Sequence, residues 1–212
     1  MLKTQECSTK WRYIQSLTQE NQRLPPPLMF KSLYGMIQKP NPAPNRNSPA
    51  TAQLWQGPPP LVLKINTDAS VQAAKNLSVA SAVIRDSSGS VVSCGVFVAH
   101  GVVDVDAAEA LAVRLGMQLS ASVPYSEFIV ESDSTSIIRR LHHPEDAIDP
   151  VQTIVDECLA LVGDRSICFQ HIPRVCNQVA RALAKWGVFF GGDCLFTGEV
   201  PFPVYELVNS IG

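Results

Sequence analysis

The order of strand-like and helix-like segments constrains the fold of this 212-residue chain more than any other feature. Three β-rich runs come first, and the turn residues 86–89 between the second and third are typical of a β-hairpin. Helices and strands then alternate. The expected elements are strands at 61–67, 78–85 and 90–99, a helix from an Asp104 or Asp106 cap to about 120, a strand at 127–131, helices at 134–142 and 150–162, a strand at 166–171 and a helix at 177–190. This order predicts an α/β fold with a five-stranded mixed sheet, in which an antiparallel three-strand meander is joined by two parallel strands, with helices on both faces.

A change in composition near residue 55 divides the chain. Before it, prolines interrupt a polar stretch that shows little periodicity, and proline removes backbone donors and fixes φ. We therefore expect residues 1–54 to be largely extended or disordered, although a short helix over 9–22 stays open. Residues 55–190 form the predicted folded domain, and 191–212 an irregular C-terminal tail.

Charge is distributed unevenly between these parts. Residues 1–50 carry seven Lys or Arg and two Glu, whereas residues 51–212 carry ten basic and seventeen acidic residues. A basic arm suits a polyanionic partner, but an acidic body repels phosphate unless cations are present. The arm can equally be a solvated tail.

Several classes of protein are disfavoured by what the sequence lacks. No apolar run approaches the ~20 residues of a membrane span, and the N-terminus has no apolar core of a signal peptide. The six cysteines form no CxxC pair and no Cys/His cluster with zinc-ligand spacing. We expect a protein of the cytoplasm or nucleus that is not secreted and has no membrane partner.

Three acidic residues stand among apolar neighbours. Asp68 follows the first strand-like run, Glu109 lies in an apolar helix, and Asp133 follows the strand at 127–131. A carboxylate in such surroundings destabilises the fold unless it is paired or coordinates a metal. Two strand ends and one helix can bring the three together. Their alternative interpretation is a set of unrelated caps and salt bridges.

Hard carboxylate ligands favour magnesium or manganese at such a site. Two divalent ions can activate a water molecule and stabilise the leaving oxygen when a phosphodiester is cleaved. The three acids therefore predict a metal-dependent phosphodiesterase with Asp68, Glu109 and Asp133 as catalytic metal ligands.

Five ordered motifs narrow this prediction. They are the Trp55–Pro60 lead into Leu63–Ser70, the hairpin 81–89, the helix motif 108–112, the strand motif 130–134, and the closing motif 172–184. In this order they resemble the ribonuclease H-like superfamily, specifically the reverse-transcriptase-like RNase H domain common in plant retroelement-derived proteins. The resemblance covers about residues 55–190.

The resemblance implies a divalent-metal-dependent endonuclease that hydrolyses the RNA strand of RNA–DNA hybrids. Two Mg²⁺ or Mn²⁺ ions are expected, held by the three acids, and the nucleic acid is the expected partner. The sequence does not determine the oligomeric state, for which we expect a monomer.

Two positions depart from the family pattern. Arg181 stands where active members carry a fourth acid, and a permanent cation there competes with the second metal ion. Ala69 stands where a glycine usually follows the first acid, and its methyl group can crowd a substrate backbone. The alternative function is therefore a domesticated, weakly active or inactive RNase H-like module that binds nucleic acid or a protein.

Four further residues are candidates for substrate contact, and most have simpler interpretations. Ser134 and Asn177 are placed to cap helices, and Arg174 to be a solvated loop residue. The four are Ser70, Ser134, Arg174 and Asn177. For Glu131, a surface or paired role is favoured over a catalytic one. For His171, a local hydrogen bond is favoured over proton transfer.

Overall fold

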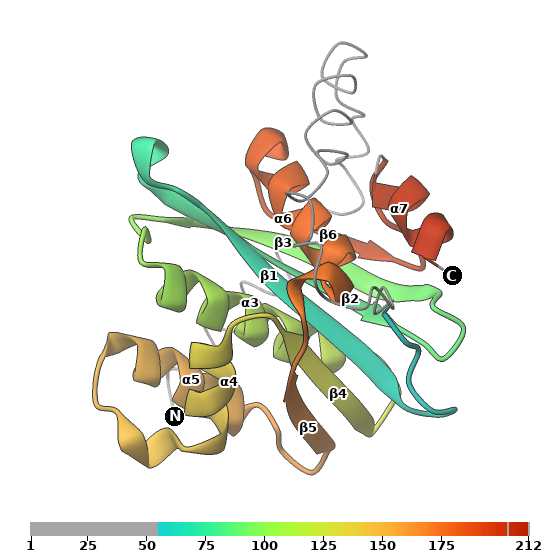
Figure 1. Cartoon of the computed structure of the whole chain (residues 1–212), viewed down its shortest axis with the longest axis horizontal. Coiled ribbons are helices and arrows are strands. Elements are labelled where there is room, and N and C mark those ends of the chain that lie inside the picture. Colours follow the sequence, from blue (N-terminus) through green and yellow to red (C-terminus); the bar gives the residue numbers. More distant parts are fainter. Residues whose placement is uncertain (1–54, 203, 212) are drawn as a thin grey trace, which may run out of the picture.

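A single six-stranded mixed sheet organises the chain. In this computed structural model, residues 55–202 and 204–211 are described, and they fold into a sheet with strand order β5-β4-β1-β2-β3-β6 (Figure 1). The strands are β1 (Leu63–Gln72), β2 (Leu77–Arg85), β3 (Val91–His100), β4 (Glu127–Ser132), β5 (Ser166–His171) and β6 (Cys194–Thr197). The predictions for residues 1–54, including the helix at 9–22, lie outside the described residues.

The predicted core of the sheet is confirmed. β1, β2 and β3 form an antiparallel meander, and β4 and β5 add to β1 in parallel. The prediction of five strands is wrong, because β6 pairs antiparallel with β3 at the edge of the sheet. β6 and a final helix, α7 (Val204–Ile211), lie within the stretch that we expected to be irregular. A strand of four residues gives too short a pattern to be read from sequence, and its pairing depends on the exposed edge of β3.

The helices cover both faces of the sheet, as predicted (Figure 1). The remaining α-helices are α3 (Val105–Ser120), α4 (Thr135–His142), α5 (Pro150–Ala160) and α6 (Gln178–Phe190). Three of them begin at a side-chain cap. Asp104, Ser134 and Asp149 accept hydrogen bonds from the backbone amides of Ala107, Ile137 and Gln152.

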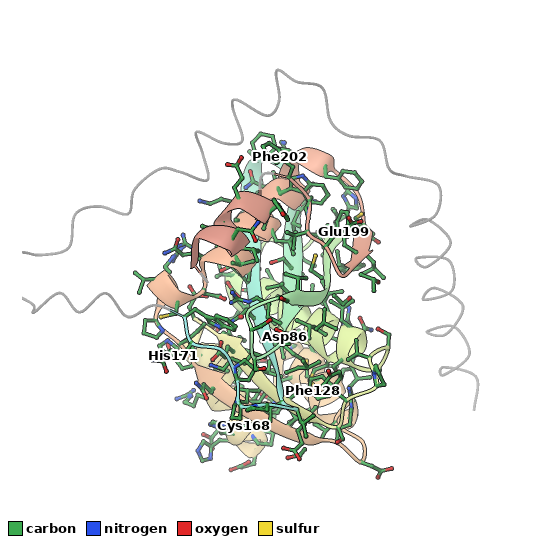
Figure 2. The ribbon with its side chains drawn as sticks, turned by 90° about the vertical axis from the view of Figure 1, so that its right-hand side faces the viewer. Asp86, Phe128, Cys168, His171, Glu199 and Phe202 are labelled. Carbon is green, nitrogen blue, oxygen red and sulfur yellow. The ribbon has the colours of Figure 1, made fainter. Side chains whose placement is uncertain are left out.

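Alternation along β2 separates two apolar cores. Ala82 and Ile84 belong to a cluster with α3, α4 and α5, whereas Val79 and Val83 belong to a cluster with α6 and α7. The side view shows Phe128, of the first cluster, towards one end of the molecule, and Glu199 and Phe202, which lie close in sequence to Val200 of the second, towards the other (Figure 2). The burial of β2 on both faces makes it the centre of the fold.

β1 extends beyond the predicted strand end. Its parallel pairing with β4 ends at the pair Thr67–Ser132, whereas its antiparallel pairing with β2 continues as far as Gln72. Asp68 therefore lies inside β1, at the point where β4 leaves its side, and not at a strand end as we expected. No helix in the described part of the chain is long and apolar enough to cross a bilayer.

Candidate metal centre

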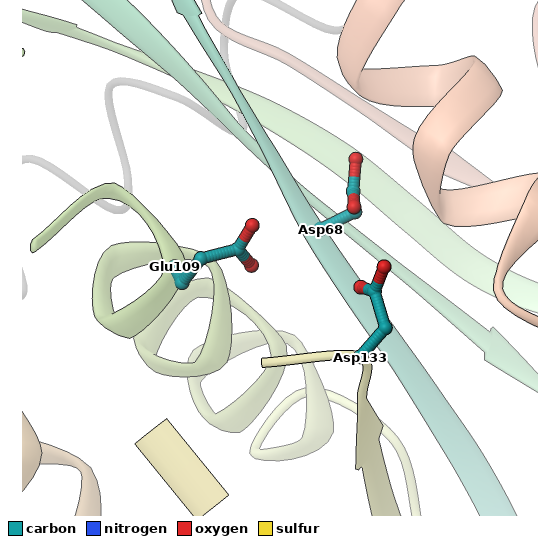
Figure 3. Close-up of side chains that lie close together, drawn as sticks. All are labelled: Asp68, Glu109 and Asp133. Atoms are coloured by element: carbon teal, nitrogen blue, oxygen red, sulfur yellow. The ribbon is translucent and has the colours of Figure 1, made fainter. Parts of the chain in front are cut away.

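The three acidic residues predicted from sequence converge in space. Asp68 lies on β1, Glu109 lies on α3, and Asp133 is the residue that directly follows β4 (Figure 3). One carboxylate oxygen from each lies within 4.8 Å of the other two. We call these three residues the acidic centre.

Close packing of α3 on β1 lets Glu109 reach the sheet. Gly116 lies two turns after Glu109 on the same side of the helix, where a Cβ atom would lie only 2.7 Å from Ile65 Cγ2 and 3.1 Å from Thr67 Cγ2. A larger residue at 116 would push the helix away from β1. The glycine therefore allows the approach that brings Glu109 to Asp68.

Burial gives the acidic centre unusual electrostatics. Asp68 is only 6% exposed, and its burial, together with the charges of Glu109 and Asp133, raises its pKa well above the usual range. Burial and the charge of Asp133 raise the pKa of Glu109 to about 8, against a hydrogen bond from the Ala69 backbone and the charge of Arg174. Glu109 Oε2 is buried and has no hydrogen-bond partner within the described residues. Without a cation, burial and the mutual repulsion of the carboxylates therefore favour the protonated forms of Asp68 and Glu109.

Two uncharged side chains tie the centre to the elements around it. Asn177 is fully buried, and its Nδ2 donates to Asp133 Oδ1 (2.9 Å) and to the Thr67 carbonyl (2.8 Å). The hydroxyl of Ser81 lies within hydrogen-bonding distance of the carbonyls of Ala180 (2.8 Å) and Asp68 (3.1 Å), which share its one proton. Ser81 thus joins β1 to the first turn of α6. Sequence reasoning missed Ser81, because a serine in a strand carries no distinctive signal.

Two arginines lie beside the carboxylates. Arg174 Nε is 3.9 Å from Asp133 Oδ2, and its side chain is 67% exposed. Arg181 follows Ala180 on α6, and its charge lowers the pKa of Asp68. Arg174 therefore lies beside the acidic centre, and its side chain is largely solvated, as the simpler expectation for a loop residue predicted.

The other predicted contact residues have local partners. Ser134 caps α4 through a hydrogen bond from the Ile137 amide (3.3 Å). Asn177 precedes α6, but its side chain makes no capping bond, since it is used by Asp133 and Thr67. Ser70 accepts a hydrogen bond from Gln72 Nε2 (3.3 Å). Their contact with a substrate stays a prediction.

His171 closes β5 next to the centre. His171 is exposed (Figure 2). In the β4–β5 register it pairs with Ser132, which is the residue before Asp133. Its role in proton transfer or in a local hydrogen bond stays a prediction.

A second cluster of charged and polar side chains is centred on β1 and β4, the two strands that also carry Asp68 and lead to Asp133. Glu131 is 1% exposed, and both of its oxygens accept from side chains of other elements. The donors are Trp55 Nε1 (3.0 Å), Asn66 Nδ2 (2.7 Å), Lys64 Nζ (2.6 Å) and Gln170 Nε2 (3.4 Å). Arg85 donates to Asn66 Oδ1 (2.8 Å) and stacks 3.4 Å from the centre of the Trp55 ring. We call Glu131, its four donor residues and Arg85 the Glu131 network. These contacts confirm the paired role expected for Glu131.

The residues of the acidic centre fit a divalent cation. All three offer hard oxygen donors, and Glu109 Oε2 has no partner among residues 55–202 and 204–211, which is an arrangement that a bound cation would satisfy. In the described residues no other group of three His, Cys, Asp or Glu side chains converges in this way. Asp68, Glu109 and Asp133 are the residues that would hold the ion.

Comparisons with known proteins agree with this geometry. The sequence matches the model of the reverse transcriptase-like family over residues 66–187, more than half of the chain. No curated protein sequence matches it significantly.

Solved structures share the fold at low sequence identity. RNase H1 from the halophilic archaeon Halobacterium salinarum NRC-1 is 18% identical, with a TM-score of 0.56 over 61% of this chain and 98% of that chain. The N-terminal RNase H domain of rv2228c from Mycobacterium tuberculosis is 18% identical, with a TM-score of 0.55 over 61% and 94% of the two chains. At this identity the likeness establishes the fold alone. The chain thus belongs to the reverse transcriptase-like family and has an RNase H-like fold.

Proposed function

We propose that this protein is an RNase H-type endoribonuclease that hydrolyses the RNA strand of RNA–DNA hybrids with divalent cations. The observation that carries the proposal is the convergence of three carboxylates, one of which keeps a buried oxygen that no other described residue binds. Buried acids with raised pKa values, gathered at one point, are typical of functional sites. The fold is that of solved proteins named as ribonucleases H.

The proposed roles of the residues follow from their surroundings. Asp68, Glu109 and Asp133 hold Mg²⁺ or Mn²⁺, with two ions expected and the second bound more weakly. The bound ions supply a water molecule of lowered pKa and neutralise charge on the phosphate. Asn177 orients Asp133, and Ser81 holds α6 against β1. The proposed functional unit is residues 55–190.

A second candidate function is supported by the charges near the site. Arg181 acts on Asp68 as a fixed cation, and the folded part of the chain carries an excess of acidic residues. A fixed guanidinium disfavours a second metal ion in the same place. The alternative is a weakly active or silent module that binds nucleic acid or a protein.

Cleavage of a labelled RNA–DNA hybrid in the presence of Mg²⁺ tests the main proposal. We expect magnesium-dependent products from the full chain and none from the Asp133→Asn variant. Equal cleavage by both proteins would remove the acidic centre from the mechanism. No cleavage by either, with hybrid binding retained, would favour the silent module.

The Arg181→Asp variant separates an impaired enzyme from a complete one. If Arg181 displaces the second ion, the added carboxylate raises the cleavage rate by about tenfold or more, which corresponds to roughly 1.4 kcal/mol of activation free energy. Arg181→Gln removes the charge without adding a ligand and serves as the matched control. An unchanged rate in both variants would show that Arg181 does not limit turnover.

A further inference from the structure

Asp133 differs from Glu109 because a side chain of the protein lies near each of its two oxygens. Asn177 Nδ2 donates to Oδ1 at 2.9 Å, and Arg174 Nε faces Oδ2 at 3.9 Å. Glu109, by contrast, keeps a buried oxygen with no hydrogen-bond partner in the part of the chain that the structure describes. Before Asp133 can give its second oxygen to a cation, Arg174 has to be displaced or its charge tolerated.

Arg174 has a fixed backbone and an accessible side chain. It opens the short 3₁₀ helix Arg174–Cys176 after β5, and its carbonyl accepts a hydrogen bond from the Asn177 amide (3.2 Å). The buried side chain of Asn177 anchors this turn to β1. The guanidinium is nevertheless 67% exposed, and its separation of 3.9 Å from Asp133 makes the ion pair weak. A weak pair between a fixed turn and a ligand carboxylate can exchange partners at little cost.

A phosphodiester is the partner that would displace this contact. Guanidinium binds phosphate oxygens through two parallel hydrogen bonds, which are stronger than a single contact at 3.9 Å. The side chain is charged at all relevant pH values, so the exchange needs no proton transfer. The same arginine can therefore neutralise Asp133 in the free protein and a backbone phosphate in the complex.

We propose that Arg174 couples nucleic-acid binding to cation binding by moving from Asp133 to a phosphate of the bound strand. In the free protein it lowers the affinity of the acidic centre for a divalent ion. Once a phosphate engages the guanidinium, Asp133 Oδ2 becomes available as a ligand. This inference rests on the proposed function, because it assigns the site a nucleic-acid partner, and it makes Arg174 a positioning residue.

Binding of Mn²⁺ to the full chain tests the first half of the proposal. Free Mn²⁺ is followed by electron paramagnetic resonance while the protein is titrated in the absence of nucleic acid. Arg174→Gln should bind Mn²⁺ roughly two- to fivefold more tightly than the wild type, the range of an exposed ion pair. Arg174→Lys, which keeps the charge, should stay close to the wild type. Arg139→Gln removes the same charge from an exposed position on α4 and should change nothing.

The second half is tested by repeating the titration with saturating nucleic acid. The probes are a DNA duplex and an RNA–DNA hybrid with a 2′-O-methylated RNA strand, chosen to stay intact. In the wild type at least one of them should tighten Mn²⁺ binding. In Arg174→Gln this gain should be smaller by the same two- to fivefold factor, because the variant has no guanidinium contact at Asp133 for the nucleic acid to release.

The outcomes separate this inference from the proposed function. Tighter Mn²⁺ binding by Arg174→Gln, with reduced coupling, supports the exchange even if the wild type cleaves no hybrid. Wild-type affinity in Arg174→Gln, or coupling of undiminished size, overturns the exchange even if the hybrid is cleaved.

Discussion

The acidic centre and the Glu131 network share β1 and β4, and along each strand a single residue separates them. Asn66 and Asp68 are alternate residues of β1, and Glu131 and Asp133 stand in the same relation along β4 and the residue after it. Glu131 is surrounded by four donors, two of which come from Lys64 and Trp55. The acidic centre instead brings three carboxylates together, and none of the described residues donates to Glu109 Oε2.

This difference distinguishes a structural cluster from a functional one. A buried carboxylate with several donors is stabilised in its charged form and helps to fix the packing of the elements around it. Carboxylates that face one another are stabilised only by protons, by cations or by nearby arginines. The Glu131 network should therefore govern stability, and the acidic centre should govern activity and metal binding.

The largest expected effect is the loss of activity on removal of a carboxylate from the acidic centre. Asp68→Asn should lower magnesium-dependent cleavage of an RNA–DNA hybrid by about 10³-fold or more, because a metal ligand supplies several kcal/mol of transition-state stabilisation. Its thermal midpoint should stay the same or rise, since a like-charge repulsion is removed. The exposed Asp164→Asn is the matched control. A marked loss of stability in Asp68→Asn would show that the centre has a structural role, which would break the distinction.

The converse change is made in the Glu131 network. Glu131→Gln should lower the free energy of unfolding by about 3 kcal/mol, because Lys64 and Arg85 then remain buried without their carboxylate. Urea denaturation followed by circular dichroism measures this difference. Glu127→Gln, at the exposed start of the same strand, should cost less than about 0.5 kcal/mol. Equal stabilities of the two variants would show that the network contributes little.

The two clusters should also differ in their response to pH. The folded-state pKa of Glu109 is about 8, above its ordinary value of 4.5, so metal-free protein loses stability as the pH rises from about 4.5 to about 8. We expect a loss on the order of 2 kcal/mol, allowing for the partial exposure of Glu109. Unfolding at several pH values should show a smaller loss in Glu109→Gln, and saturating Mg²⁺ should reduce it in the wild type. An identical pH profile in wild type and Glu109→Gln would contradict the raised pKa.

The smallest expected effect separates the two contacts of Trp55. Trp55→Phe keeps a ring beside Arg85 but removes the N–H donor to Glu131, and it should cost about 1 kcal/mol. Trp55→Ala loses the stacking as well and should cost about 2 kcal/mol. Chemical denaturation measures both values. Equal losses would assign the whole contribution of Trp55 to its hydrogen bond.

Much of the fold could be predicted from local patterns. The strand 166–171 and the beginnings of the helices that Ser134 and Asp149–Pro150 introduce were read from short segments, because caps, turns and alternation are local signals. β6 and α7 could not be read in this way. Their stability comes from pairing with β3 and packing on α6, which are contacts with distant parts of the chain.

The same division holds for the candidate site. The sequence by itself identified Asp68, Glu109 and Asp133, because each is a charged residue in an apolar or strand-forming context and lies in a family motif. It did not show that Asp68 lies within a strand, that Ser81 joins β1 to α6, or that Arg174 faces Asp133. Those relations were decided by the tertiary structure alone. The sequence shows which residues carry charges that need partners. The side chains that bind the carboxylates of Glu131 and Asp133 come from positions 39 to 76 residues away, and only the folded sheet brings them within a few ångströms.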